Sequence, residues 1–344
     1  MGDLETLSAI YGCPVGSFFL DEVPAERVPM RFRGRMSVAE HPLPAETKMS
    51  LQRLRTFAEW LVPILDEMGW KVTIPVAAQT DDPEQLARDQ RRRLGFSDQV
   101  RKGWKTYEDA YRWWRQQIEG QGIICLQWDL CKSLEQDSWL SAPLRGASFR
   151  IGNFSFIVVN RSDREAAAGR IFSLLHEYGH LLRAYGGFVC DFIEPEEREE
   201  RFANRFAARM LVLPEELQEV LSELSLRPQR KWSDYWLDKI RKRLCVSRDV
   251  IAIGLSEAGW APPDLYQMKI QEWQKSVWRG RGRRLRGVQR LRQNLGSIVP
   301  ELLLKAHRQR LISVLDLAEV LKVDAVRAAT LLEEVVGIQE APQR

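Results

Sequence analysis

The sequence predicts an α+β fold in which a small mixed sheet packs on helices, flanked on both sides by mainly helical regions. Three observations predict it. Apolar residues between Ile171 and Leu182 recur at helical spacing. Residues from Phe154 to Val159 form a short apolar run with alternating side chains, which is typical of a mostly buried strand. After Pro214 the chain shows amphipathic helical patterns almost throughout.

Residues 1–47 are predicted as a helix-turn-helix-like remnant followed by a linker. The stretch from Leu4 to Glu22 resembles the closing helices of a phage-repressor-type domain, but the part that would carry a recognition helix is missing. We therefore expect no working DNA reader here, with a simple amphipathic helix as the alternative. The stretch from Val23 to Thr47 contains four prolines and is predicted as the linker.

Residues 48–225 are predicted as the central domain. Helical spacing of apolar residues indicates a helix from Met49 to Trp70 and further helical structure from Asp82 to Gly120. The Trp113-Trp114 pair is expected in the core or at a domain interface.

Two more strands are expected before the one at Phe154. The run GIICLQWDL predicts one strand, and Gly152-Asn153 is a plausible turn between SFRI and the buried strand. We expect Ala147–Ile151 to lie along an exposed edge of the sheet, where an extended peptide could add as a further strand. An ordinary hairpin is the alternative for this stretch.

Two of the four histidines fall in one five-residue segment, HEYGH, from His176 to His180. On a helix these positions lie on the same face, so both imidazoles can bind one metal ion. Glu177 stands beside the first histidine and can reach a water bound to that metal. The pattern is typical of a zinc peptidase, although such a motif can also occur by chance on a solvated helix.

Catalytic zinc sites usually take three protein ligands and leave one position for water. A second helix is predicted before Pro214, with Phe202 and Phe206 in its buried stripe. Glu200 and Asn204 lie four residues apart on one face of it. Glu200 is our candidate for the third ligand, and Asn204 for a partner that orients a ligand histidine. The other nearby acids are expected to form a solvated, acidic helix start.

These segments resemble the ImmA/IrrE family of bacterial metallopeptidases. The resemblance rests on FIVVN, on IFSLLHEYGHLL and on the pattern E-x-x-A-N-x-F-A-A-x-x-L-x-x-P, and it is firm over residues 147–216. Phe202 stands where the family often has a polar or acidic residue, which leaves Glu200 as the only acid in register. The resemblance implies one zinc ion per chain, catalysis by the motif glutamate, and these matching positions: His176, His180 and Glu200 as ligands and Glu177 as the catalytic residue.

The expected chemistry is hydrolysis of a peptide bond. Zinc lowers the pKa of its bound water from about 15.7 toward 7. Glu177 accepts that proton as the carbonyl is attacked, and then passes it to the leaving amine. The oxyanion needs a further donor, for which Tyr178, Tyr185 or an arginine could serve. His41 and His307 have no local context for this role and are expected to be surface or core histidines.

Residues 226–344 are predicted as a helical C-terminal domain and possible sensor. The segment SRDVIAIGLSEAG resembles a helix-turn-helix-like piece that need not bind DNA, and the final stretch predicts two short helices. An arginine run with interleaved glycines suits phosphate contacts and base stacking, so a surface for single-stranded DNA is one interpretation. A solvated basic loop or salt-bridged helix is the equal alternative. The run comprises Arg279, Arg281, Arg283, Arg284, Arg286, Arg290 and Arg292.

Composition excludes several classes of protein. A net charge of +4 over 344 residues argues against a general polyanion binder. No run of eighteen apolar residues is present, so no membrane span is expected. The N-terminus has no basic region typical of a signal peptide. The five cysteines, an odd number with no paired spacing, are consistent with reduced thiols, so a cytoplasmic location is expected. Most cysteines are expected in the core, although a thiolate of Cys131 or Cys190 could cap the zinc.

The leading functional expectation is a zinc endopeptidase that cleaves a specific protein. The family resemblance implies that the substrate is a helix-turn-helix repressor, cleaved after a stress signal such as DNA damage or phage, with single-stranded DNA as a possible activator. The alternative is a regulator that uses the zinc fold structurally and acts by contact, without cutting.

Overall fold

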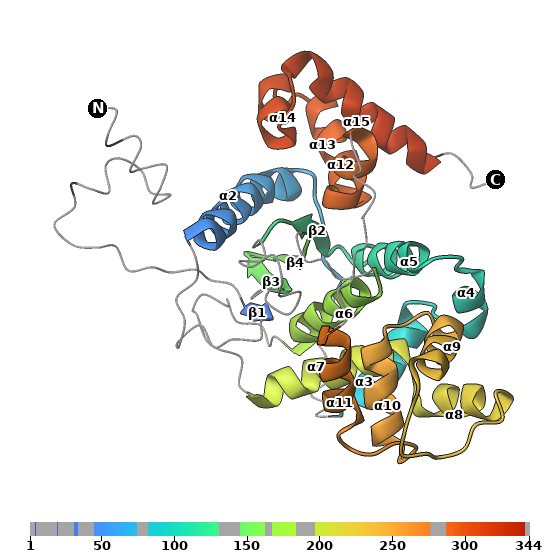
Figure 1. The fold of residues 1–344 in the computed structure, drawn as a ribbon. Coiled ribbons are helices and arrows are strands. Elements are labelled where there is room, and N and C mark those ends of the chain that lie inside the picture. Colours follow the sequence, from blue (N-terminus) through green and yellow to red (C-terminus); the bar gives the residue numbers. More distant parts are fainter. Residues whose placement is uncertain are drawn as a thin grey trace.

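The computed structural model describes residues 31–33, 45–73, 82–130, 145–161, 167–183, 197–275 and 287–340, together with Leu4 and Phe19 singly (Figure 1). The remnant predicted at Leu4 to Glu22 lies outside the described residues apart from those two. In the described part of the chain, no helix is long and apolar enough to cross a membrane.

The strands are β1 (Arg31–Arg33), β2 (Ile124–Trp128), β3 (Gly146–Ile151) and β4 (Phe154–Asn160). The helices of the first half are α2 (Ala45–Glu67), α3 (Pro83–Arg93), α4 (Asp98–Gly103), α5 (Tyr107–Glu119) and α6 (Ala167–Arg183). The second half carries α7 (Glu197–Leu211), α8 (Pro214–Glu223), α9 (Asp234–Leu244), α10 (Arg248–Glu257), α11 (Leu265–Lys275), α12 (Gly287–Leu295), α13 (Ile298–Arg308), α14 (Val314–Leu321) and α15 (Ala325–Glu340). The predicted α+β class is confirmed.

The four strands form one mixed sheet in the order β1-β3-β4-β2. β3 and β4 are an antiparallel hairpin whose turn contains Gly152 at φ +57°, a left-handed conformation that favours glycine. β2 runs parallel to β4. Both strands predicted from GIICLQWDL and from the Phe154 run are therefore present.

The expected position of Ala147–Ile151 at the edge of the sheet is wrong for Ala147 and Ser148, because β1 pairs with them on the side away from β4, whereas β1 leaves Phe149–Ile151 unpaired. β1 also lies inside the stretch predicted as a linker, so that prediction is wrong for Arg31–Arg33. A strand of three residues is too short to show an alternating pattern, which is why the sequence did not indicate it.

Helices cover both faces of the sheet. Successive residues of β4 point to opposite faces and therefore pack in two different cores. Ile157 and Val159 pack in the core that contains α6, whereas Phe156 and Val158 pack in the core that contains α2. Figure 1 shows α2 on one face of the sheet and α6 on the other. All seven residues of β4 are buried, as expected for a central strand between two helical layers.

The helices α6 and α7 lie in close contact at Gly179. A Cβ atom at this position would come within 2.8 Å of the Phe206 ring on α7. The glycine thus allows a close approach that any larger residue would obstruct. This contact sets α7 beside the part of α6 that carries the histidine motif.

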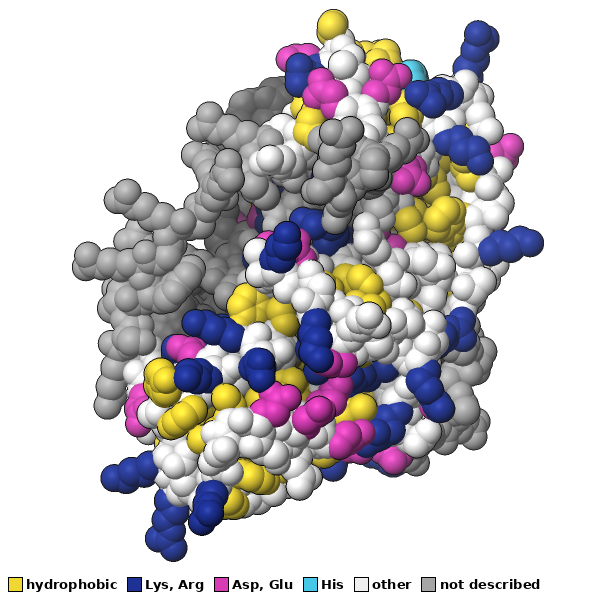
Figure 2. All heavy atoms as spheres, turned by 90° about the vertical axis from the view of Figure 1, so that its right-hand side faces the viewer, with side chains coloured by type: hydrophobic (Ala, Val, Ile, Leu, Met, Phe, Trp, Pro, Cys, Tyr) yellow, Lys and Arg dark blue, Asp and Glu magenta, His cyan; other side chains and the backbone are white. Residues whose placement is uncertain are grey.

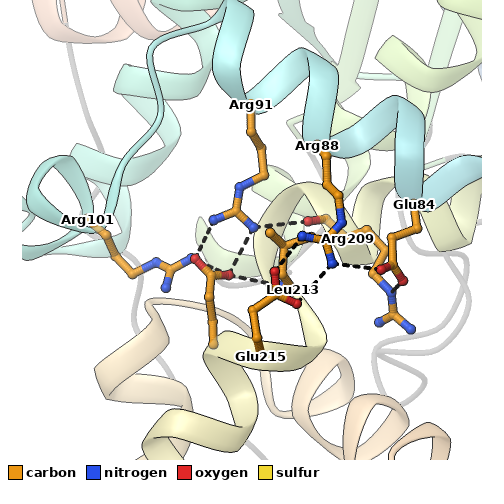
Figure 3. Close-up of polar contacts among 8 residues, drawn as sticks. Glu84, Arg88, Arg91, Arg101, Arg209, Leu213 and Glu215 are labelled. Carbon is orange, nitrogen blue, oxygen red and sulfur yellow. Dashed lines mark hydrogen bonds and ion pairs between the residues drawn. The ribbon is translucent and has the colours of Figure 1, made fainter.

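A network of ion pairs fixes α3, α4, α7 and α8 to one another (Figure 3). Arg91 and Arg101, both nearly buried, donate to the carboxylate of Glu216, with Arg101 at 3.1 Å. Glu216 also accepts a bond of 2.8 Å from the backbone N–H of Leu213 at the start of α8. On the same surface Arg209 of α7 donates to Glu84 at 2.9 Å. α7 is thereby held by charge as well as by packing.

Of the predicted tryptophan pair, Trp114 lies in the core and Trp113 packs against it. Trp114 is 1% exposed and stacks with Phe96 at a centroid distance of 4.8 Å. Trp113 and Trp104 pack at the border of the same cluster.

The C-terminal helices α12 and α13 attach to α5 through a buried ion pair. Arg115 donates to Glu119 at 2.9 Å, and both side chains are almost fully buried. Glu119 accepts bonds from the N–H and the hydroxyl of Ser297, at 3.2 and 2.5 Å, while Arg115 donates to the carbonyl of Gln293 at 2.6 Å. Gly296, at φ +76°, lies directly against this pair.

Candidate metal centre

The motif residues lie in the middle of α6, which packs between the sheet and α7. Leu174, Leu175 and Tyr178 form its apolar stripe and are fully buried. His176, Glu177 and His180 are buried as well, at 0, 0 and 3% exposure. Burial of three polar side chains in one helical turn is costly unless they have partners.

The two histidines turn the same ring nitrogen toward a common point. The Nε2 atoms of His176 and His180 are 3.0 Å apart, and the ring planes are inclined at 79°. The i, i+4 spacing therefore produces the shared face that the sequence predicted.

Glu200 of α7 completes this group. One of its carboxylate oxygens lies 3.0 Å from Nε2 of His180, and the other lies 3.4 Å from Nε2 of His176. His176, His180 and Glu200 are the residues whose ligand atoms lie close enough together to hold a metal ion within the described ranges. The predicted convergence of the two helices on one point is present.

The donor set fits a small divalent cation. A tetrahedral ion with bonds of about 2.0–2.1 Å holds its ligand atoms roughly 3.3 Å apart, close to the separations found here. Two nitrogen lone pairs and a carboxylate repel one another at such distances unless a positive charge lies between them. A divalent cation would satisfy all three atoms at once.

Glu200 favours its charged form even without a cation. Burial by itself would raise the pKa of its carboxyl, but hydrogen bonds donated by His176 and His180 outweigh burial and hold that pKa well below its usual range. Its side chain remains 27% exposed, so the centre opens toward solvent at this ligand. Glu199, the preceding residue, instead pairs with Arg183 at 2.7 Å.

The carboxylate of Glu177 lies against β3. One carboxylate oxygen accepts a hydrogen bond of 2.8 Å from the hydroxyl of Ser148. A Cβ at Gly146 would lie 2.8 Å from the other oxygen, so only glycine leaves room for this carboxylate. The sequence analysis missed both β3 residues, although the glycine two positions before a serine in RGASF was a usable signal.

Asn204 is exposed on α7. The buried Nδ1 of His180 has no hydrogen-bond partner in the described part of the chain, so Asn204 does not orient that ring there. The role assigned to Asn204 stays a prediction.

Tyr178 is excluded as the oxyanion donor. Its hydroxyl donates to Gln90 at 2.7 Å and accepts from Gln121 at 2.9 Å inside the core, and burial raises its pKa. Tyr185 lies outside the described residues. The ring of His307, on α13, forms a hydrogen bond of 3.1 Å with the carbonyl of Ile312. This contact gives His307 a structural role, as expected.

The thiol and nucleic-acid predictions fall largely outside the described residues. Cys131 and Cys190 lie there, as do Arg279, Arg281, Arg283, Arg284 and Arg286. Cys125 is buried in the core, where burial raises the pKa of its thiol. On the face seen in Figure 2, lysines and arginines are interspersed with acidic side chains and form no large patch of one sign.

Two facing helices that bring a His-Glu-x-x-His motif and a glutamate together define the centre of a peptidase with a possible metal site. Residues 141–256 match the model of the IrrE N-terminal-like domain. This match supports the resemblance to ImmA/IrrE peptidases that the sequence analysis indicated for this part of the chain. The match runs from β3 to α10 and so includes every residue of the centre. Comparisons with curated proteins and with solved structures found no match.

Proposed function

We propose that the protein is a zinc-dependent endopeptidase, with His176, His180 and Glu200 as ligands of one zinc ion and Glu177 as the catalytic base. The observation that carries this proposal is the convergence of His176, His180 and Glu200 from α6 and α7. The two histidine Nε2 atoms are 3.0 Å apart, and the two Glu200 oxygens lie 3.0 and 3.4 Å from them. The match of residues 141–256 to the IrrE N-terminal-like domain supports the same chemistry.

The bound zinc ion and the residues around it would have separate roles. Zinc, when bound, supplies a Lewis acid that activates water and polarises a carbonyl. Ser148 holds the carboxylate of Glu177 in place through its hydroxyl. Glu177 takes a proton from the attacking water and delivers it to the leaving amine. The burial of Glu177 keeps competing water away from that carboxylate.

The proposed substrate is a helix-turn-helix transcriptional repressor, cleaved after a stress signal such as DNA damage or phage, with single-stranded DNA as activator. The resemblance to ImmA/IrrE peptidases is the support for this choice. The arginines from Arg279 to Arg286 are the candidate DNA contact, motivated by their charge.

The test uses the purified protein and a candidate repressor, with and without a chelator and a single-stranded oligonucleotide, and measures fragment masses. Cleavage should require metal and should disappear in Glu177→Gln, which keeps zinc and fold. Regulation that survives Glu177→Gln would instead support a non-proteolytic regulator. Fluorescence anisotropy with a labelled oligonucleotide tests the DNA contact, and affinity unchanged after neutralising the arginines would reject it.

A further inference from the structure

β1 lies on the side of β3 that would otherwise be free. It runs antiparallel to β3, with Arg31 opposite Ser148, Phe32 opposite Ala147 and Arg33 opposite Gly146. β4 pairs with the other side of β3 along its whole length. Over Gly146–Ser148, both sides of β3 are therefore paired with other strands.

The three β3 residues opposite β1 include both neighbours of the catalytic carboxylate. Ser148 bonds Glu177 at 2.8 Å, and Gly146 leaves the space that the Glu177 side chain fills. β1 covers this half of β3 and leaves Phe149–Ile151 unpaired with it. The short strand thus lies along the part of the sheet edge that is closest to the reacting groups.

An edge strand presents a row of N–H and C=O groups to which an extended peptide adds. A peptide that is to bring a carbonyl beside Glu177 from this edge needs the backbone groups of Gly146–Ser148 that β1 now occupies. The segment Arg31–Arg33 and such a peptide therefore exclude each other.

We propose that β1 is an intramolecular inhibitor of the peptide-binding edge. It occupies the backbone position of a substrate strand and must leave before a substrate can bind. This rests on the proposed peptidase function. The pairing spans three residues, shorter than the usual strand of about 5–6 residues, so a longer substrate strand can replace it. Because β1 is tethered, its effective concentration is on the order of millimolar, which is sufficient to exclude dilute peptides.

The first experiment compares two double variants of the full chain in a Glu177→Gln background, which prevents cleavage. Arg31→Pro with Phe32→Pro removes two adjacent backbone donors, whereas Arg31→Ala with Phe32→Ala removes the same side chains and keeps the donors. Hydrogen exchange measured by mass spectrometry should rise over residues 146–148 in the proline variant and stay low in the alanine variant. Unchanged protection of α6 and α7 would show that the fold is retained.

Peptide binding gives the second measurement on the same proteins. A fluorescein-labelled synthetic peptide of residues 28–36 should bind the proline variant at least tenfold more tightly than the alanine variant, and a scrambled peptide should bind neither. Equal exchange and equal affinity in the two variants would overturn the proposal. Neither measurement depends on cleavage. Failure of the proposed peptidase function can therefore be distinguished from failure of the proposal that β1 blocks the edge.

A disulfide provides a test that does not disrupt the strand. Phe32 and Ala147 are directly opposite each other, and facing positions on antiparallel strands lie within the Cα separation of about 4.4–6.8 Å that a disulfide needs. Oxidised Phe32→Cys with Ala147→Cys should lose peptide binding at least tenfold, and reduction should restore it. Full binding in the oxidised, cross-linked protein would refute the proposal.

Discussion

Glu199 and Glu200 are neighbours in the sequence with different surroundings. Glu199 forms an ion pair with Arg183 at 2.7 Å, whereas Glu200 lies 3.0 Å from His180. Their position on α7 separates them, because successive helical residues point about 100° apart.

The first prediction compares these two carboxylates. Glu200→Gln should lower zinc affinity by about 100-fold or more, since loss of a partner outside the ligand set already costs about 10–100-fold. Glu199→Gln should change zinc affinity by less than about threefold. Zinc retained after dialysis against a competing chelator is the measurement, and an equal loss in both variants would contradict the assignment of Glu200.

The second prediction concerns the hydroxyl that holds Glu177. Ser148→Ala should lower kcat by about tenfold with little change in KM or in bound zinc, because the base loses the donor that orients it. Ser155→Ala removes an equally buried hydroxyl from β4 and serves as the control. Steady-state kinetics on a cleaved peptide decides, and equal effects of the two variants would indicate a general loss of packing.

The sequence predicted that His176 and His180 lie together because helical spacing alone brings them to one face. It did not predict Ser148 or Gly146, because a strand's contact with a helix depends on sheet order and register, which local patterns do not contain. The motif thus identified the polar side chains that α6 carries, but not the β3 residues that contact them.

At the level of elements, long periodic segments were predicted well. The helix expected from Met49 to Trp70 corresponds to α2, and the helical stretch from Asp82 to Gly120 divides into α3, α4 and α5. β1 was missed because its three residues depend on pairing with β3 rather than on local preference. Tertiary contacts therefore determine the least predictable part of the sheet.

The third prediction addresses the ion pairs that fix α8 to α3 and α4. Burial raises the pKa of Glu216, but the hydrogen bond from Arg91 and the charge of Arg101 outweigh it, so the net pKa lies below its ordinary value of 4.5. A carboxyl with a lowered folded pKa stabilises the protein above its unfolded pKa, and this contribution is lost as pH falls through the folded pKa. Stability should therefore decrease below about pH 5.

Glu216→Gln should cost about 3 kcal/mol at neutral pH, because it leaves two nearly buried guanidinium groups without their carboxylate. It should also weaken the acid dependence. Glu215→Gln is the matched control: its side chain is 56% exposed and pairs with Arg88, so its loss should cost less than about 1 kcal/mol. Urea unfolding at several pH values measures both, and equal costs would show that the buried pairs are not decisive.

At the scale of the whole molecule, the sheet is enclosed between a layer that carries the centre and a layer formed by α2 and the C-terminal helices. Composition and helical patterning predicted the helical C-terminal part, and the family match ends at residue 256, before α12. The contact between these parts includes the buried pair Arg115–Glu119. An i, i+4 pair is a common surface pattern, so nothing in the sequence indicated that this one is buried.

The last prediction tests this attachment through two glycines that share a left-handed backbone. Gly296 has φ +76°, and a Cβ there would lie 2.6 Å from Arg115 as well as against Glu119. Gly287 has φ +55° and open space around it. Gly287→Ala should cost about 1 kcal/mol for the backbone alone, whereas Gly296→Ala should cost about 3 kcal/mol or more because the ion pair must also move. Hydrogen exchange over α12 and α13 should increase in Gly296→Ala while α6 and α7 stay protected. Equal unfolding free energies in the two variants would show that the C-terminal helices do not depend on this pair for their position.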